Sequence, residues 1–205
     1  MTPTRSTYHH GNLRTALVEA ATELARERGP EGVVLREVAR RTSVSHNAAY
    51  RHFADREELL AATADVGMAR LEEAMRAQVA RVRTKEPREA ARQRMRAVGR
   101  GYVQFALAEP GLFETAFTGA DPKGTDPYGS SRAAGPYGLL SQALDDAMEQ
   151  GGVSPERRPG AEVLCWSAVH GFAKLHLHGP LRAVPARLRD EALEQMLDRI
   201  EQALA

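Results

Sequence analysis

Hydrophobic residues recur every three or four positions along most of the chain, a spacing that predicts amphipathic helices. Residues 13–25 follow this rule closely, and Gly29-Pro30 ends the helix. Similar stripes predict helices at about residues 55–82, 87–109, 112–117, 137–150, 159–178 and 186–203. Together with two short helices between residues 34 and 53, they predict an all-α protein of about nine helices.

Residues 34–53, VLREVARRTSVSHNAAYRHF, predict two short helices joined by a tight turn. On the first helix Val38 and Ala39 face inward, and Val44 is the apolar residue of the turn. Ser45 can cap the second helix, because its hydroxyl can accept a hydrogen bond from an otherwise unpaired amide. This arrangement is a helix-turn-helix.

The second of these helices is suited to a DNA groove. Ala49 and Phe53, four positions apart, face inward, and the small side chains of Ala48 and Ala49 keep the helix slim, as the major groove requires. The residues left on its outer side are His46, Asn47, Ala48, Tyr50, Arg51 and His52.

The charge of this region differs from that of the whole chain. Between residues 36 and 56 five arginines stand against Glu37 and Asp55, a local net charge of +3, whereas the chain carries only +1. A basic patch on a near-neutral protein favours a single anionic contact surface. The alternative interpretation is a solvated helical hairpin with ordinary surface arginines.

Residues 8–71 closely resemble the N-terminal DNA-binding domain of TetR-family transcriptional regulators. The matching stretches are YHHGNLRTALVEAATELARERG and LREVARRTSVSHNAAYRHFADREELL. Val34 departs from the pattern, because the family usually has Thr or Ser capping this helix and Val cannot cap. The resemblance implies a DNA-binding domain at 8–58 and a regulatory and dimerisation domain at 59–205, in a protein of the bacterial cytoplasm close to the nucleoid.

The resemblance and the outward positions together predict the DNA contacts. By resemblance, the Tyr50 hydroxyl and His52 bind phosphates, and Arg56 occupies the position of a phosphate-binding lysine. His46 and Asn47 are placed to reach base edges. The predicted DNA-binding set is Arg36, Arg41, Ser45, His46, Asn47, Tyr50, Arg51, His52 and Arg56. We expect no metal and no cofactor.

The helix predicted at 159–178 has apolar residues on all sides, so other helices must pack against every side of it. Its small residues would let another helix come close, and the TetR family dimerises through such a pair of C-terminal helices. The predicted dimer interface is Ser167, Gly171, Leu175, Leu193, Met196, Leu197 and Ile200. A homodimer presents two recognition helices, so double-stranded DNA with an inverted-repeat operator is the expected partner.

Trp166-x-x-x-His170-Gly171 resembles the Trp-His-Gly signature of one class of TetR C-terminal domains, and GLFETAF at 111–117 fits that class. By resemblance, an effector bound here would tilt the connecting helix and change the spacing of the recognition helices. The alternative is that Trp166 and His170 belong to the core. The predicted pocket for a small hydrophobic or aromatic effector is Met68, Tyr102, Phe105, Phe113, Phe117, Met148, Trp166 and His170.

Two segments carry open alternatives. Residues 118–136, rich in Gly and Pro, predict a poorly ordered loop, either an inert linker or a gate to the pocket. Tyr8, His9 and His10 either reach DNA or form a disordered tail. For the whole protein we expect a ligand-responsive repressor and not an enzyme. The alternatives are an architectural or partner-controlled DNA-binding factor without an effector, and a helical enzyme that kept the domain by descent. The sequence does not disclose whether the outcome is repression or activation.

Several classes of protein are disfavoured. Cys165 is the single cysteine, which excludes an intrachain disulfide. We find no signal peptide and no apolar run of membrane-spanning length. His176 and His178 are two residues apart, so their rings lie on different sides of a helix and do not form a metal site. No catalytic motif is present.

Overall fold

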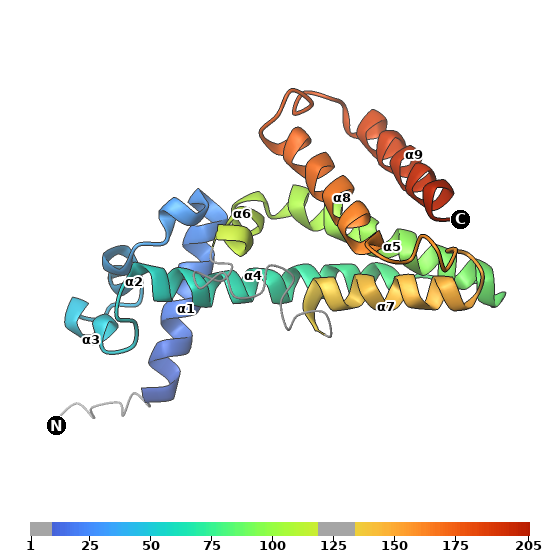
Figure 1. Cartoon of the computed structure of the whole chain (residues 1–205). Helices are drawn as coiled ribbons and strands as arrows, with labels where there is room; N and C mark the ends of the chain where they lie inside the picture. Colours follow the sequence, from blue (N-terminus) through green and yellow to red (C-terminus); the bar gives the residue numbers. More distant parts are fainter. Residues whose placement is uncertain (1–9, 119–133) are drawn as a thin grey trace. The chain divides into compact units, whose positions relative to one another are not determined.

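The computed structural model describes residues 10–118 and 134–205, and these residues form α-helices with one short 3-10 helix and no strand. The prediction of an all-α protein of about nine helices is therefore confirmed for this part of the chain (Figure 1). None of the described helices is both long and apolar enough to cross a membrane. Most of the predicted loop at 118–136 lies outside the described residues.

The chain divides into two compact units. The first comprises Met1–Gly67 with Gly111–Pro122, and the second comprises Met68–Pro110 with Lys123–Ala205, as far as these residues are described. The helix α4, Arg56–Val79, is continuous and contributes to both units. The boundary that the sequence predicts between the two domains, between residues 58 and 59, falls within this helix.

The first unit contains α1 (His10–Arg28), η1 (Pro30–Gly32), α2 (Leu35–Arg41), α3 (His46–Tyr50), the start of α4, and α6 (Pro110–Thr118). Gly29 ends α1 with a φ of +67°, a conformation that glycine adopts without a steric cost. Gly111 lies so close to the end of α1 that a Cβ there would be 2.2 Å from the Ala25 carbonyl oxygen. The core residues include Leu17, Leu24, Val38, Ala49, Phe53 and Leu59.

The second unit is built around α5 (Pro87–Ala108), which packs against α7 (Gly135–Glu149) and α8 (Ala161–Leu177). The last helix, α9 (Ala186–Leu204), packs on α5 and α8. At one crossing with α4, a Cβ on Gly101 would lie 2.6 Å from the Met75 Cα, so only glycine allows this approach. Buried apolar side chains of this unit include Tyr102, Val103, Leu144, Val169, Ala173 and Leu197.

Local capping signals place several helix ends where the sequence predicts them. Asp55 Oδ1 accepts a hydrogen bond from the Glu58 amide at 2.8 Å at the start of α4. Glu58 Oε2 accepts one in return from the amide of Ala54 at 2.7 Å, one residue earlier than in a standard capping box. As predicted, Val34 gives α2 no side-chain cap. The end of α4 comes earlier than predicted, at Val79.

Candidate nucleic-acid interface

The recognition helix α3 is anchored by two buried side chains. Ala49 and Phe53 are completely buried, as the spacing predicts. The Arg14 guanidinium lies over the Phe53 ring, 4.7 Å from its centre, and adds a cation–π contact from α1. Ser45 caps the helix by accepting a hydrogen bond from the Ala48 amide at 3.2 Å. The helix is therefore fixed to the unit by one face only.

The opposite face of α3 is open to solvent. His46, Asn47, Tyr50 and Arg51 are exposed, and His52 is half-buried. The rings of His46 and Tyr50 meet edge to face with centroids 4.6 Å apart. An exposed face of donors and acceptors on a slim helix is what reading a major groove requires. Their roles as DNA contacts stay predictions.

The turn before α3 holds a residue in an unfavourable backbone conformation. Ser43 has a φ of +54°, in the left-handed region that residues with a Cβ rarely adopt. The Val44 amide donates to the Ala39 carbonyl at 3.0 Å, which closes the turn against the end of α2. This closure sets the direction in which α3 leaves α2.

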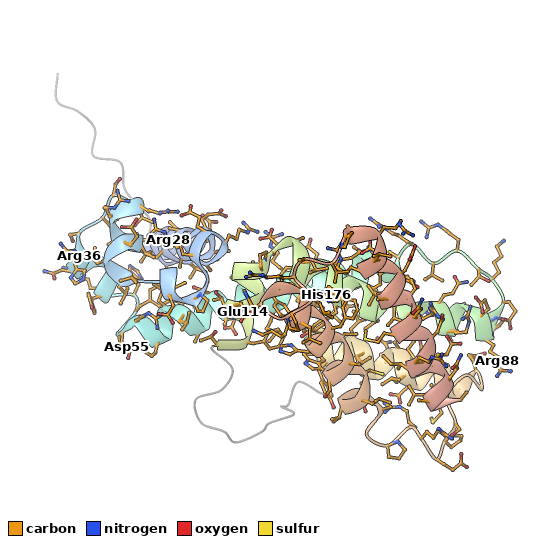
Figure 2. All side chains as sticks on the ribbon, turned by 90° about the horizontal axis from the view of Figure 1, so that it is seen from above. Arg28, Arg36, Asp55, Arg88, Glu114 and His176 are labelled. Atoms are coloured by element: carbon orange, nitrogen blue, oxygen red, sulfur yellow. The ribbon has the colours of Figure 1, made fainter. Side chains whose placement is uncertain are left out.

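The predicted arginine contacts divide into two groups. Arg41 forms two hydrogen bonds with Glu27, at 2.8 and 2.5 Å, and Arg56 donates to the Pro30 carbonyl at 2.7 Å. By contrast, Arg36 and Arg51 are exposed and have no ion-pair partner among the described residues (Figure 2 labels Arg36). The second group is thus available to an anion without breaking an existing bond.

Two residues that support this interface were not predicted from the sequence. Glu27 and Arg14 both lie on α1. Glu27 contacts Arg41 on α2, and Arg14 contacts Phe53, so both partners are far away along the chain. Because helical periodicity relates only residues three or four positions apart, no local signal points to either pair. Of the predicted N-terminal arm, Tyr8 and His9 lie outside the described residues, and His10 is the first residue of α1.

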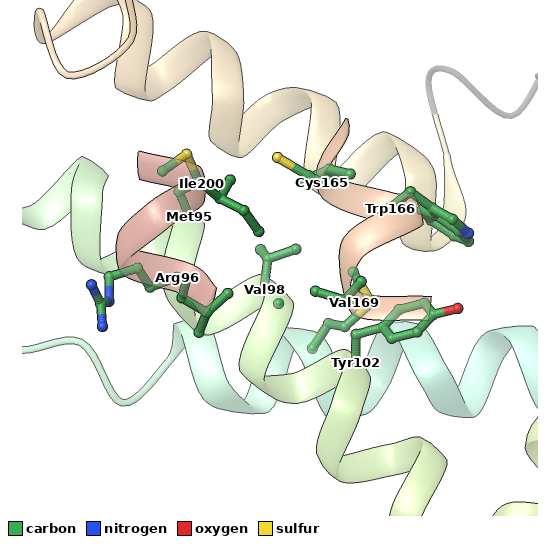
Figure 3. A pocket seen from close by; sticks show the side chains of 12 residues that line it. Met95, Arg96, Val98, Tyr102, Cys165, Trp166, Val169 and Ile200 are labelled. Carbon is green, nitrogen blue, oxygen red and sulfur yellow. The ribbon is translucent and has the colours of Figure 1, made fainter. Parts of the chain in front are cut away.

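The second unit contains an apolar cavity of about 30 Å³ (Figure 3). Tyr102 and Trp166, both in the predicted pocket, line it, and their rings lie edge to face with centroids 5.3 Å apart. The Tyr102 hydroxyl and His170 Nδ1 share a hydrogen bond of 2.7 Å. The described lining is Met75, Met95, Arg96, Val98, Gly99, Tyr102, Leu140, Cys165, Trp166, Val169, Leu197 and Ile200.

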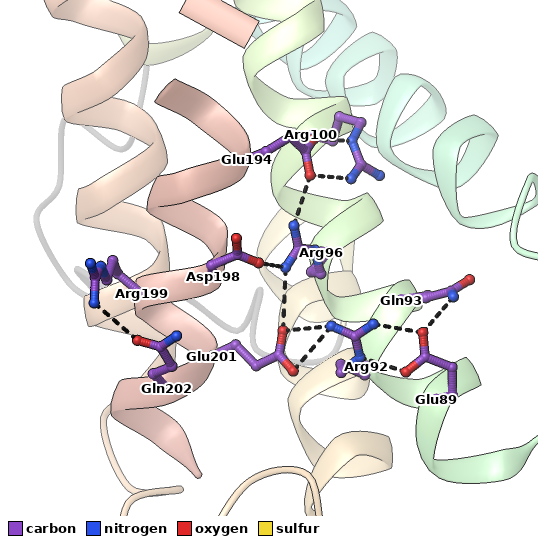
Figure 4. A network of polar contacts seen from close by, with 10 residues as sticks. All are labelled: Glu89, Arg92, Gln93, Arg96, Arg100, Glu194, Asp198, Arg199, Glu201 and Gln202. Carbon is purple, nitrogen blue, oxygen red and sulfur yellow. Dashed lines mark hydrogen bonds and ion pairs between the residues drawn. The ribbon is translucent and has the colours of Figure 1, made fainter. Parts of the chain in front are cut away.

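The cavity has few groups suited to catalysis. Burial raises the pKa of the Cys165 thiol to about 12, so this thiol stays protonated and is a poor nucleophile. Burial also raises the pKa of the Tyr102 hydroxyl. Arg96 lines the cavity with its stem, because its guanidinium turns toward carboxylates on α9 (Figures 3 and 4). A cavity with such walls suits a neutral, apolar molecule.

Other residues of the predicted pocket lie elsewhere. Phe113 and Phe117 belong to the first unit, where their rings pack with centroids 5.0 Å apart. Met68, Phe105, Met148 and His170 are in the second unit but are not part of the described cavity lining; these four stay predictions. The predicted set joined a motif resemblance with apolar residues of several helices, and neither specifies which side of each helix faces the cavity.

A ladder of ion pairs joins α5 to α9 beside the cavity (Figure 4). Arg96 lies within 2.8 Å of Glu194 and also pairs with Asp198. Arg100 donates two hydrogen bonds to Glu194, at 2.7 and 2.8 Å. These bonds, with a smaller contribution from the hydrogen bond of Arg96, lower the pKa of Glu194 to about 2. Arg92 pairs with Glu201 at 3.1 Å. The ladder fixes which face of α9 turns inward.

The predicted dimer residues consequently separate into two sets. Leu193, Leu197 and Ile200 are buried within the chain itself, so they have no surface left for a partner. Met196 is half-buried and stays a prediction. Ser167 and Leu175 on α8 are exposed, and nothing lies within 4 Å of the position that a Cβ on Gly171 would take. Exposed large apolar residues on this helix are Val163, Leu164 and Leu175.

Across residues 10–118 and 134–205, no three His, Cys, Asp or Glu side chains are grouped closely enough to hold a metal ion. His176 is buried, with its Nδ1 2.9 Å from the Phe172 carbonyl oxygen, whereas His178 is exposed. The two rings therefore point to different sides of the helix end, as their spacing predicts.

The fold and the exposed α3 define a helix-turn-helix protein with a separate helical unit. Residues 17–63 match the family described as bacterial regulatory proteins, tetR family, and residues 95–200 match the tetracyclin repressor-like C-terminal domain. The second match alone covers half of the chain. The protein belongs to the TetR family.

Individual proteins are also similar to this chain. A transcriptional repressor of the helix-turn-helix type from Mycobacterium tuberculosis is 40% identical over 53 residues, which are 26% of this chain and 28% of that relative. The chain thus aligns with well under two thirds of the length of its curated relatives. A Rhodococcus protein of unknown function has a TM-score of 0.78 at 29% identity, covering 98% of this chain and 100% of its own.

A more distant structure shares the fold. A TetR protein from Acinetobacter baumannii in complex with minocycline has a TM-score of 0.60 at 19% identity, and the alignment covers 92% of this chain and 93% of that one. At this identity the likeness concerns the fold alone.

Proposed function

We propose that this protein is a transcriptional regulator that binds an inverted-repeat operator as a homodimer. The observation that carries the proposal is α3, which buries Ala49 and Phe53 and leaves His46, Asn47, Tyr50 and Arg51 exposed. Base edges in the major groove are read by such donors and acceptors. The proposed regulator works as a repressor, as does the M. tuberculosis relative that is 40% identical over 53 residues.

The dimer is proposed to form through α8 and the outer face of α9. Leu164 and Leu175, both 44% exposed, lie on the same face of α8 as Gly171, which allows a second helix to come close. Leu188 on α9 is equally exposed. This assignment replaces Leu193, Leu197 and Ile200 of the predicted interface, because those side chains are used inside the chain.

The effector is proposed to be a small, neutral, apolar or aromatic molecule bound at the cavity of the second unit. Met75 lines this cavity and lies on α4, the same continuous helix that begins at Arg56 after the recognition helix. A ligand that enlarges the cavity would shift α4 and would favour one arrangement of the recognition helices over another. The minocycline complex of the Acinetobacter protein provides a precedent within this fold.

The size of the cavity favours a second candidate function. A void of about 30 Å³ holds a water molecule or two and no drug-sized ligand unless side chains move. An architectural or partner-controlled DNA-binding factor without an effector would need no larger cavity. Operator binding indifferent to small molecules would support this candidate.

The first experiment is a binding selection from a random duplex library with the purified chain at near-physiological salt. Enrichment of an inverted repeat supports a dimeric, sequence-specific regulator. If no sequence is enriched and binding falls steeply with salt, the contacts are to phosphate alone and the architectural candidate is favoured.

The effector is tested with the fluorescence of Trp166, the only tryptophan of the chain and part of the cavity lining. Small neutral aromatic compounds are screened for a saturable change in emission and for release of the selected duplex. A Cys165→Leu variant, which places a larger side chain in the cavity, is the control and should lose the response. A response that persists in this variant would place the ligand elsewhere.

A further inference from the structure

A hollow opens on the first unit between the end of α1, η1 and α2. It has a volume of about 620 Å³ and is open to solvent. Three arginines, Arg28, Arg36 and Arg40, contribute to its wall. The other described lining residues are Glu31, Gly32, Val34 and Glu37. The arginines therefore supply all the hydrogen-bond donors among the lining side chains.

Each of the two acidic residues of the hollow lies near an arginine other than Arg28 and Arg36. Glu37 forms hydrogen bonds of 2.9 and 2.7 Å with Arg40, which lower the pKa of its carboxyl, and Glu31 lies 3.8 Å from Arg56. Arg28 and Arg36 are exposed and have no ion-pair partner in the described part of the chain. The hollow thus presents two guanidinium groups that are in no described ion pair, and Arg28 attracts the Glu37 carboxylate only at longer range.

The hollow belongs to the same unit as the recognition helix. Arg36 and Arg40, four positions apart, share a face of α2, and α2 packs against α3. Figure 2 labels Arg28 on α1 and Arg36 farther out on this unit. A duplex whose major groove receives α3 has a phosphate backbone on each side of that groove, so the neighbouring surface of α2 meets phosphates.

We propose that this hollow binds a DNA backbone phosphate outside the groove that α3 reads. Arg28 and Arg36 would bind the phosphate oxygens, for which the guanidinium fork is well suited. Arg40 would remain hydrogen-bonded to Glu37 and would lie near the phosphate without binding it. The inference rests on the proposed DNA-binding function and assigns Arg28 and Arg40 a role that the recognition helix does not explain.

The test measures how operator affinity depends on salt. The duplex found by selection and an unrelated duplex of equal length are titrated with the full-length chain at several salt concentrations. In an Arg28→Ala/Arg36→Ala variant, the slope of log affinity against log salt should fall by about 0.9 for each subunit of the dimer, the value for one lost phosphate contact. Affinity for both duplexes should fall roughly tenfold for each subunit of the dimer, as expected for a lost hydrogen bond to a charged group.

Two control variants make the result specific. Arg81→Ala removes an exposed arginine of the second unit that has no ion pair among the described residues, and it should leave the slope unchanged. Arg28→Lys/Arg36→Lys keeps both charges and should retain most of the slope. Circular dichroism confirms that each variant is folded.

The outcomes separate this inference from the function on which it rests. If the wild-type chain selects no duplex, the proposed function fails. If the wild type binds and the double alanine variant keeps its slope, only the phosphate site in the hollow is refuted. A loss confined to the selected operator also overturns it, because that result indicates a base contact.

Discussion

Arg41 on α2 is bound to Glu27 on α1 by two parallel hydrogen bonds, Nη1–Oε1 at 2.8 Å and Nη2–Oε2 at 2.5 Å. The hydrogen bond from Arg41 is also the main reason that the pKa of Glu27 is lowered. The pair connects two helices of the first unit at residues 14 positions apart. It gives Arg41 a structural partner where the sequence predicted a DNA contact.

Replacing Arg41 with alanine should therefore affect the fold more than DNA binding. We expect a slightly lower unfolding temperature and an unchanged slope of operator affinity against salt. Glu27→Ala should lower the unfolding temperature similarly, and the double variant should lose less than the sum of the two. A slope that falls by about 0.9 for each subunit in Arg41→Ala would show that Arg41 leaves Glu27 to bind a phosphate.

Replacing Ser43 with glycine should stabilise the first unit. Ser43 has a φ of +54°, and the left-handed region costs a residue with a Cβ about 1–2 kcal/mol. After allowance for the greater freedom of glycine in the unfolded chain, a gain of about 1 kcal/mol is expected in denaturant unfolding. Ser43→Ala keeps the Cβ and should show no such gain; equal gains in both variants would contradict the strain argument.

Tyr50→Phe and Asn47→Ala should have different effects on DNA binding. Loss of the Tyr50 hydroxyl should weaken binding to every duplex by about 1.5–3 kcal/mol, if it donates to a phosphate. Asn47→Ala should change the preference among operator variants, because an amide side chain reads a base edge. Both are measured as affinities across a set of single-base operator variants. An unchanged ranking in Asn47→Ala would remove it from the base contacts.

Charged substitutions on the outer face of α8 should separate the dimer. Leu164 and Leu175 are exposed in the single chain, so Leu164→Glu/Leu175→Glu should leave the fold intact and give a monomer in sedimentation analysis. Operator affinity should fall with the dimer. Gln142→Glu, an exposed position on α7, serves as the matched control. A double variant that still sediments as a dimer would place the interface on another surface.

The ion-pair ladder should make stability depend on pH in the acidic range. Hydrogen bonds from Arg100 and Arg96 lower the pKa of Glu194 from 4.5 to about 2. Its stabilising contribution is therefore complete above about pH 4.5 and is lost as the pH falls toward 2. Glu194→Gln should be less stable than the wild type at neutral pH, and this difference should shrink on acidification. High salt should also reduce it.

Helix boundaries could be predicted from the sequence because their causes are local. The hydroxyl of Ser45 and the carboxyl of Asp55 accept hydrogen bonds from amides three residues later, and Gly29 ends α1 where the pattern breaks. The helix-turn-helix is also local, since Ala49 and Phe53 are buried at the spacing of one helical turn. Neighbouring positions in the chain contain all that these features require.

Pairings between distant helices could not be predicted in this way. Leu197 and Ile200 were expected at a dimer interface, but the ladder of Arg92, Arg96 and Arg100 turns their face of α9 inward. An apolar stripe shows that one face of a helix is buried, but it does not specify which surface packs against that face.

The sequence by itself determined the all-α class, the recognition helix and the family, since each depends on local spacing or on a motif. Only the tertiary structure decided which arginines remain available, because Arg41 and Arg56 find partners on α1 and η1 whereas Arg36 does not. The physical reason is that a charged side chain binds whatever opposite charge or carbonyl folding brings within reach, and folding joins residues that are far apart in the chain.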